Sequence, residues 1–329
     1  MKDLKRLLPG ALVSIALIAA ILYFVDLKTM WNAIRGANYR ILAGSAVLSF
    51  LWLFIRAKVW QTLLRNKPKY MDVFYSAGEG YLLNNFLPFR LGELGRAFLL
   101  SRKSGMAFSE ILPTIIIERV VDLAYSAAIL LAALPYVANS QDSQKIGYIV
   151  AGVVVVGPVL MYVLALNNKW ALNTFHKLSV RWPILHKYGG SFLESFLDGL
   201  GVLTNGWLFI RFLFWMSLNW FVALISYYTI TLAFFPQARP VWTLFILGAA
   251  AFGGAIPALP GGVGTFDGAI SAALYLFTND QSTSLAVALT ARLYNYLNSV
   301  VVGGIGLMRE GQTLSGVYQQ LMALRKKEE

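Results

Sequence analysis

Three charged residues stand among glycines in a stretch that lies between strongly apolar segments. Residues 84–100, NNFLPFRLGELGRAFLL, contain Arg90, Glu93 and Arg96. A guanidinium group binds two oxygens of a phosphate through paired hydrogen bonds, and a neighbouring carboxylate orients it. On a helix that begins near Leu91, Glu93 and Arg96 are three residues apart and share a face. The stretch therefore predicts an anion-binding turn, whereas a purely structural turn would bury the pair against neighbouring helices.

A second group of charges lies in the apolar segment 108–135, where IIIERVVDL carries Glu118, Arg119 and Asp122. Glu118 is about 15 Å from the start of that helix, near the centre of a hydrocarbon core about 30 Å thick. Charges at that depth cost about 2.5–3.5 kcal/mol each, so they face protein or a water-filled cavity. Two interpretations remain open. The charges form a structural ion pair with residues 84–100, or their arginines hold an anionic head group in a cavity.

The stretch LPGGVGTFD, residues 259–267, resembles the first one in its Leu-Pro pair and in the aliphatic residue and glycine that follow. About thirty residues later each stretch is followed by an arginine in an apolar helix, Arg119 or Arg292. Helices that restart near Leu91 and Thr265 would point unpaired amide N–H groups at one region, with Thr265 as an N-cap, and a phosphate fits such a site. The alternative is that proline and glycine only make a turn. The predicted tip residues are Asn85, Pro88, Gly92, Pro260, Gly261, Gly262, Gly264, Thr265 and Asp267.

Asparagines near the tips have two open roles, lining the same cavity or forming hydrogen bonds between helices. They are Asn84, Asn85, Asn295 and Asn298. Three glycines near the end of the last apolar segment, Gly303, Gly304 and Gly306, are predicted close-packing positions. The predicted substrate-binding residues are Arg90, Glu93, Arg96, Glu118, Arg119, Asp122, Arg292 and Asn295.

Composition indicates a membrane protein, because 57% of the 329 residues are hydrophobic and only 13% are charged. The 28 Lys and Arg residues against 16 Asp and Glu are typical of cytoplasmic loops in such a chain, so nucleic acid is not an expected partner. The absence of cysteine excludes disulfides and thiolate chemistry. His176 and His186 lack metal-ligand spacing, and no GxxxxGK[ST] stretch occurs. We therefore expect no metal and no cofactor.

Six apolar segments are long enough to cross a membrane, and two others are broken by proline and glycine. Proline removes a donor and glycine tolerates left-handed backbone, so each broken segment is predicted as two helices that meet at a turn. The predicted spans are roughly 7–25, 41–64, 108–135, 146–166, 207–235 and 284–308, and the broken segments are 74–100 and 242–277.

If both broken segments turn back, the basic segments fall on the cytoplasmic side, apart from the loop 26–40. Both termini are then cytoplasmic, and the loop 278–283 is outside. The segment 167–206 is predicted to form amphipathic helices on the cytoplasmic surface of the cell membrane, which is the inner membrane in a cell with two. The second span delivers to the cytoplasmic side the basic run Arg56, Lys58, Arg65, Lys67 and Lys69.

The order span, span, hairpin, span occurs twice, the second time from the opposite side, which is an inverted repeat of the kind that secondary transporters use. The predicted fold is thus an all-α integral membrane protein with six transmembrane helices and two opposed re-entrant helical hairpins. The first repeat is 1–140 with its hairpin at 72–102, the second is 141–310 with its hairpin at 242–277, and 311–329 is a cytoplasmic tail.

The motifs NNFLPFRLGELGR, IIIERVVDL and LPGGVGTFD resemble those of the flippase-like transmembrane family named after lysylphosphatidylglycerol synthase, the membrane half of the multiple peptide resistance factor. The resemblance covers roughly residues 10 to 310. In that factor it implies translocation of an aminoacylated phospholipid that a soluble carboxy-terminal synthase domain makes. This chain stops at Glu329, about twenty residues after its last predicted span, so synthase activity is not expected. Other members are linked to glycolipid, hopanoid or polyprenyl-lipid pathways.

The sequence predicts a flippase or carrier for an anionic, aminoacylated or glycosylated lipid, which works by alternating access around a midplane polar site. Its partner is the membrane lipid. Without a nucleotide-binding motif, coupling is to a gradient or to lipid imbalance, with Glu93, Glu118 and Asp122 as candidate proton carriers. Two alternatives stay open: a membrane-embedded lipid transferase with one of these carboxylates as base, and a non-catalytic partner of a separate lipid-synthesising enzyme.

Overall fold

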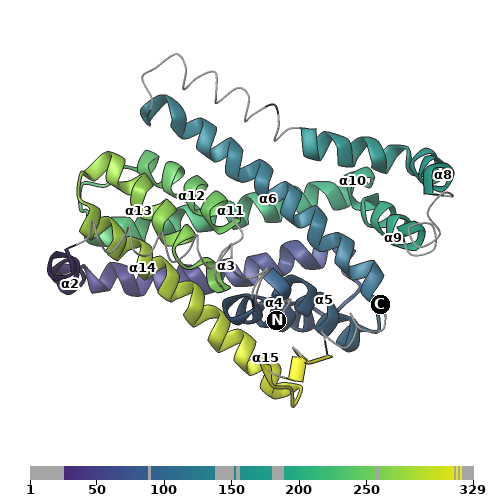
Figure 1. Cartoon of the computed structure of the whole chain (residues 1–329), viewed down its shortest axis with the longest axis horizontal. Helices are drawn as coiled ribbons and strands as arrows, with labels where there is room; N and C mark the ends of the chain where they lie inside the picture. The colour runs from purple at the N-terminus through teal and green to yellow at the C-terminus, as the bar shows by residue number, and fades with distance from the viewer. Residues whose placement is uncertain are drawn as a thin grey trace, which may run out of the picture.

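The computed structural model describes residues 26–87, 90–137, 152, 156–179, 189–255, 260–314, 316–317 and 319–320. This part of the chain is built from helices and contains no strand, which confirms the all-α class (Figure 1). The predicted span 7–25, Pro88 and the tail beyond residue 320 lie outside the described residues.

In chain order the elements are α2 (Leu27–Gly36), α3 (Tyr39–Leu63), α4 (Tyr70–Phe86), α5 (Leu91–Ser104), α6 (Phe108–Val137), α8 (Asn168–Ser179), α9 (Gly190–Gly199), α10 (Gly201–Thr204), α11 (Gly206–Phe234), α12 (Pro240–Ala255), the 3-10 turn η3 (Pro260–Gly262), α13 (Thr265–Thr278), α14 (Gln281–Asn298), the π-helical turn η4 (Ser299–Gly303) and α15 (Gly304–Arg309).

Three helices among the described residues are long and apolar enough to cross a membrane: Tyr39–Leu63, Gly206–Phe234 and Gln281–Arg309. They coincide with three of the predicted spans. The predicted span 108–135 is covered by α6, which carries the charges of IIIERVVDL, and part of the span predicted at 146–166 forms the shorter apolar helix Val156–Leu166.

The segment predicted as an outside loop, 26–40, forms the short helix α2 instead. Asp26 caps it by accepting hydrogen bonds from the Lys28 amide at 2.9 Å and the Thr29 hydroxyl at 2.6 Å. These bonds, first that from the Thr29 hydroxyl, hold the pKa of Asp26 below its ordinary value. The Asn38 side chain caps α3 in the same way and separates the two helices. The capping side chains of Asp26 and Asn38 therefore stabilise helical structure in the polar segment 26–40.

The segment predicted as amphipathic at 167–206 is helical in its described parts, as α8, α9 and α10. Trp170 and Leu178 of α8 are exposed, at 63% and 76%. Leu197 and Leu200, around the end of α9, are buried in a cluster with Ile117 of α6. Only α8 thus presents a broad apolar face to the surroundings.

The first helical hairpin consists of α4 and α5, which pack against each other. The chain reverses at Arg90, whose φ of 55° lies in the left-handed region, and α5 begins at Leu91 as predicted. A Cβ on Gly92 would stand 2.1 Å from the carbonyl oxygen of Gly80, so only glycine permits this approach. The Asn84 side chain accepts a hydrogen bond from the Gly92 amide at 2.9 Å. The glycine and the asparagine therefore set the separation of the two helices.

The second helical hairpin consists of α12 and α13, joined through η3. Gly261, Gly262 and Gly264 have φ of 71°, 64° and 89°, which favour glycine. The predicted cap at Thr265 is wrong by one residue, because Gly264 is the N-cap and Thr265 the first helical residue. The Asp267 carboxylate accepts a hydrogen bond from the Gly264 amide at 3.2 Å and so replaces the expected hydroxyl cap.

The two hairpins begin and end at opposite ends of the helix bundle (Figure 1). At one end, Lys103 at the close of α5 pairs with Glu310, which follows the last helix. At the other end, the amide of Asp26 donates to the hydroxyl of Ser282, just after the α13–α14 turn, at 3.1 Å. The tips lie together, because η3 packs against α4 and the Arg90 guanidinium donates to the carbonyl of Gly254.

The last helix is continuous from α14 through η4 into α15, and its π-helical turn packs against α4. The Asn85 amide donates to the Ser299 hydroxyl in this turn at 2.7 Å. A Cβ on Gly303 would lie 2.5 Å from the carbonyl oxygen of Gly78, so the two backbones are in direct contact. Gly306 is also tightly packed, but Gly304 has nothing within 4 Å of an added Cβ, so its predicted packing role is wrong.

We predict opposite effects for alanine at two neighbouring glycines of the last helix. Gly303→Ala forces α4 away and should destabilise the protein by about 1–3 kcal/mol. Gly304→Ala meets open space and should be neutral or stabilising by up to about 1 kcal/mol, because alanine favours helix. Thermal unfolding of the detergent-solubilised protein measures both. Equal melting temperatures for the two variants would contradict the proposed contact between the backbones.

Candidate functional site

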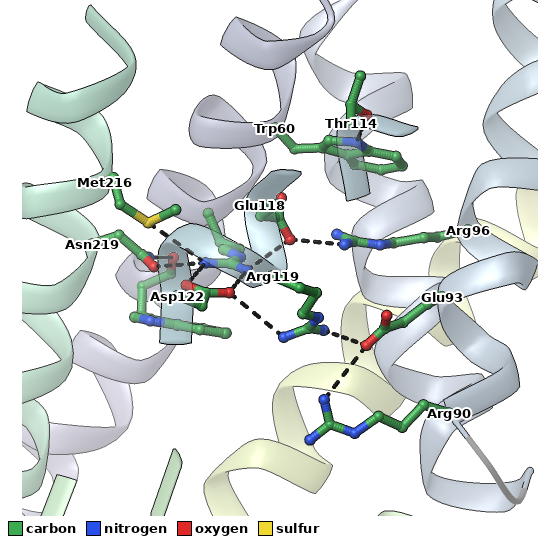
Figure 2. A network of polar contacts seen from close by, with 12 residues as sticks. Trp60, Arg90, Glu93, Arg96, Thr114, Glu118, Arg119, Asp122, Met216 and Asn219 are labelled. Carbon is green, nitrogen blue, oxygen red and sulfur yellow. Dashed lines mark hydrogen bonds and ion pairs between the residues drawn. The ribbon is translucent and has the colours of Figure 1, made fainter. Parts of the chain in front are cut away.

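A buried arginine on α3, Arg56, is the centre of an ionic network with two carboxylates of α6, Glu118 and Asp122, which Figure 2 labels. Arg56 donates to Glu118 at 2.7 Å and to Asp122 at 2.8 Å, both on α6. From α11, the Asn219 side-chain oxygen lies at 3.5 Å and the Met216 sulfur at 3.9 Å. Arg56 and Glu118 are almost completely buried. The arginine therefore ties α3, α6 and α11 together inside the protein.

A second arginine reaches the same carboxylate from the first hairpin. Arg96 of α5 donates to the Glu118 oxygen that Arg56 also contacts, at 2.7 Å. Its guanidinium lies over the ring of Trp60, 4.6 Å from the centroid, and the Trp60 indole donates to the Thr114 hydroxyl at 3.0 Å. The aromatic ring covers one face of the charge in a position that favours a cation–π contact. This side of the network is sealed from its surroundings.

The other side of the network is partly open. Arg119 of α6 pairs with Glu93 at 2.8 Å and with Asp122 at 3.6 Å, while Arg90 lies 3.6 Å from Glu93 (Figure 2). The Arg119 and Arg90 side chains are 29% and 42% exposed. A ligand that reaches the network therefore meets Arg90 and Arg119 first.

The network carries more positive than negative charge. Its arginines are Arg56, Arg90, Arg96 and Arg119, and its carboxylates are Glu93, Glu118 and Asp122, which leaves one positive charge in excess. Several of its buried polar atoms also have no hydrogen-bond partner among the described residues. They are the donors Nε of Arg56, Nε and Nη1 of Arg96 and Nε of Arg119, and the acceptors Oε1 of Glu93 and Oε2 of Glu118. Unused donors and a net positive charge suit an anion.

The equivalent arginine of the second half has a different environment. Arg292 donates to Asp267 at 2.6 and 2.7 Å, to the carbonyls of Gly261 and Gly262 at 2.8 and 2.9 Å, and to the Tyr296 hydroxyl at 3.2 Å. A guanidinium has five N–H donors, and these five bonds use all of them. The arrangement therefore favours a structural role for Arg292, which closes the turn of the second hairpin.

The structure gathers six of the predicted binding residues into the first network and leaves two outside it. Arg292 pairs with Asp267, and Asn295 lies three residues further along the same helix, α14. Of the predicted tip residues, Asn85 bonds to the last helix and the second tip is held by Arg292. The six gathered residues are Arg90, Glu93, Arg96, Glu118, Arg119 and Asp122.

The sequence predicts the central residue of this network, Arg56, in a cytoplasmic basic run, and this prediction is wrong. Arg56 lies inside α3, seven residues before Leu63, and is 2% exposed. An available signal was the apolar sequence on both sides of it, LWLFI before and VW shortly after. Glu79, which is also fully buried, was not singled out at all.

The described residues contain no group of three or more His, Cys, Asp or Glu side chains that could hold a metal ion. The carboxylates of the network are instead occupied by guanidinium groups. The chemistry that this arrangement offers is recognition of an anion by arginine.

Comparison with known proteins gives a family for most of the chain. The family model of the lysylphosphatidylglycerol synthase TM region matches residues 10–303. A UPF0104 membrane protein of Methanocaldococcus jannaschii is 26% identical over 68% of this chain and 92% of its own length. A UPF0104 membrane protein of Methanothermobacter thermautotrophicus is 22% identical over 93% of each chain. No solved structure matches the chain significantly.

We predict that Arg56→Gln destabilises the protein by about 3–5 kcal/mol, because Glu118 and Asp122 then remain buried without their shared partner. The matched control is Arg40→Gln at the exposed start of the same helix, which should change stability by less than about 0.5 kcal/mol. Chemical unfolding in detergent measures the difference. If the two variants unfold alike, the network does not hold α3 to α6.

Proposed function

The chain belongs to the family of the transmembrane region of lysylphosphatidylglycerol synthase, and we propose that it moves an anionic, aminoacylated or glycosylated lipid across the cell membrane. The observation that carries the proposal is the network of four arginines and three carboxylates where the two hairpin tips meet. A lipid head group with a phosphate fits such a site, because guanidinium groups bind phosphate through paired hydrogen bonds.

The exposure of the side chains on the open side of the network indicates the order in which a phosphate contacts the arginines. A phosphate meets Arg119 and Arg90 first, since these side chains are partly exposed, and competes with Glu93 for them. Arg56 and Arg96 stay fixed on Glu118 behind them. The excess positive charge then compensates the phosphate without requiring a carboxylate to leave the network.

Alternating access requires that the contact between the two tips breaks and forms again. The described tip-to-tip hydrogen bond is that between the Arg90 guanidinium and the Gly254 carbonyl. Arg90 also holds a left-handed backbone, which a non-glycine residue adopts at a cost. A lipid phosphate that draws Arg90 away from Gly254 separates the hairpins, so ligand binding and movement share one residue.

Both hairpins are proposed to be re-entrant, with the α5–α6 connection in the cytoplasm and the α13–α14 turn outside. Because the chain has no cysteine, single thiols report on each side without background. We predict that Ala107→Cys reacts with an impermeant maleimide only from the cytoplasm, and Gln281→Cys only from outside. Reaction of both thiols from one side would contradict the opposed hairpins.

The transport test uses fluorescent phosphatidylglycerol in vesicles that contain the purified protein. We predict that Arg90→Gln and Arg119→Gln slow lipid movement by about 10- to 100-fold, since a hydrogen bond to a charged group contributes about 1.5–3 kcal/mol. Arg40→Gln is the control at an exposed site outside the network. Arg292→Gln should lower the amount of folded protein and leave the rate per folded molecule unchanged.

Three results separate this proposal from its alternatives. Lipid movement no faster than in empty vesicles, or wild-type rates for Arg90→Gln and Arg119→Gln, would contradict it. Formation of a new lipid product from labelled donors, detected by mass spectrometry, would indicate a transferase. Lipid movement that appears only after a synthesising enzyme is added would indicate a partner role.

A further inference from the structure

A second ionic cluster lies within the first hairpin and is made of different residues from the central network. Lys103 of α5 contacts the two carboxylate oxygens of Glu79 on α4 at 2.8 and 3.0 Å, and the Ser76 hydroxyl at 3.0 Å. The same ammonium group pairs with Glu310, directly after the last helix. The Glu79 side chain is completely buried, and that of Glu310 is 21% exposed. One ammonium group therefore serves two carboxyl groups from two different parts of the fold.

Tight packing holds this cluster between the hairpin and the last helix. A Cβ on Gly306 would stand 2.3 Å from the Glu79 carboxylate, so a glycine at this position leaves the space that the carboxyl group occupies. The residue before Glu79 is Gly78, which is in backbone contact with Gly303. The Glu79 side chain thus lies in the contact surface of α4 with the last helix, where a change in its charge is felt by both elements.

The cluster has the opposite charge balance to the central network. Two carboxylates and one ammonium group leave one negative charge in excess, and the site is largely buried. The carboxyl groups of Glu79 and Glu310 share the Lys103 ammonium group as their ion-pair partner. One ammonium group neutralises only one of the two carboxylates, so in this largely buried site a proton on the other removes the remaining negative charge.

We propose that Glu79 binds a proton and that this proton ties the first hairpin to the last helix. With the proton bound, the Glu79 O–H donates to Glu310, and Lys103 neutralises Glu310. When the proton leaves, two negative carboxylates face each other across the contact and repel, so the hairpin loosens. A rise in pH therefore opens the hairpin and a fall closes it. Within the proposed transport function this makes the proton the coupling ion, but the contact does not depend on what the central network binds.

The other charged groups on the elements around α4 have partners of their own. On the last helix, Arg309 lies over Tyr75 and bonds to its hydroxyl at 3.1 Å. On α5 and α3, Arg96 bonds to Glu118, Arg102 to Gln320, and Lys58 to Gln61. The charge that faces Glu79 is therefore set by Lys103 and Glu310.

Hydrogen exchange of the full-length protein in lipid nanodiscs tests the proposal, because exchange reports local opening of a segment. Exchange of residues 70–104, corrected for the intrinsic effect of pH, should rise by about 5- to 150-fold between acidic and alkaline pH, the range of a typical coupling between linked sites. In Glu79→Gln the amide stays neutral and can donate to Glu310, so exchange should remain at the slow, acidic level throughout.

Two further variants make the outcome decisive. Glu310→Gln removes the same repulsion at a partly exposed position, so it carries the test if Glu79→Gln does not fold, and its exchange should also lose its pH dependence. Glu110→Gln changes an exposed glutamate at the start of α6 and should follow the wild type. Corrected exchange that is independent of pH in the wild type, or a wild-type response in Glu79→Gln or Glu310→Gln, would overturn the proposal. Because no lipid movement is measured, failure of the transport function leaves this result intact.

Discussion

The cost of burying a guanidinium group among apolar helices is the constraint on which the rest of the structure depends. An unpaired charge in such a place is strongly unfavourable, so each buried arginine must be met by carboxylates from another element. Arg56 satisfies this requirement by joining α3 to Glu118 and Asp122 of α6. The same carboxylate of Glu118 then accepts Arg96 from the first hairpin. The positions of three elements follow from one set of ion pairs.

The two arginines that occupy equivalent places in the halves show how this constraint is used differently. Arg292 has a partner for every N–H group, and these partners include two carbonyls of the turn that it closes. Arg119 is partly exposed and its Nε atom has no hydrogen-bond partner among the described residues. A saturated guanidinium stabilises a fold, whereas a partly used one retains donors for a ligand. The two arginines, which follow similar stretches of the sequence, therefore differ in whether a donor remains unpaired among the described residues.

The first hairpin connects the two charged clusters. Arg96 and Lys103 are seven residues apart on α5, which places them on one face of the helix two turns apart. Arg96 holds the hairpin to α6, and Lys103 joins α5 to α4 within the hairpin and to Glu310 after the last helix. Because glycines bring the backbones of α4, α5 and the last helix into contact, a shift at one cluster has little room to be absorbed locally. The hairpin is therefore placed to transmit a change in charge from one cluster to the other.

The sequence by itself determined the helical class, three spans long enough for a membrane, the two breaks that separate paired helices, and the restart of α5 at Leu91. These features depend on hydrophobic length and on proline and glycine, which act through neighbours in the chain. Charge patterning also singled out six residues of the central network, because an ionisable residue inside an apolar segment requires a partner. Only the tertiary structure decided which partner each one has. In the sequence, Arg56 is part of a basic run, and Glu79 and Lys103 are unrelated charges. Their pairing becomes visible only in the folded protein, where α3 packs on α6 and α4 packs on α5. Their roles depend on atoms at least 24 residues away along the chain, and no local pattern encodes contacts over such separations.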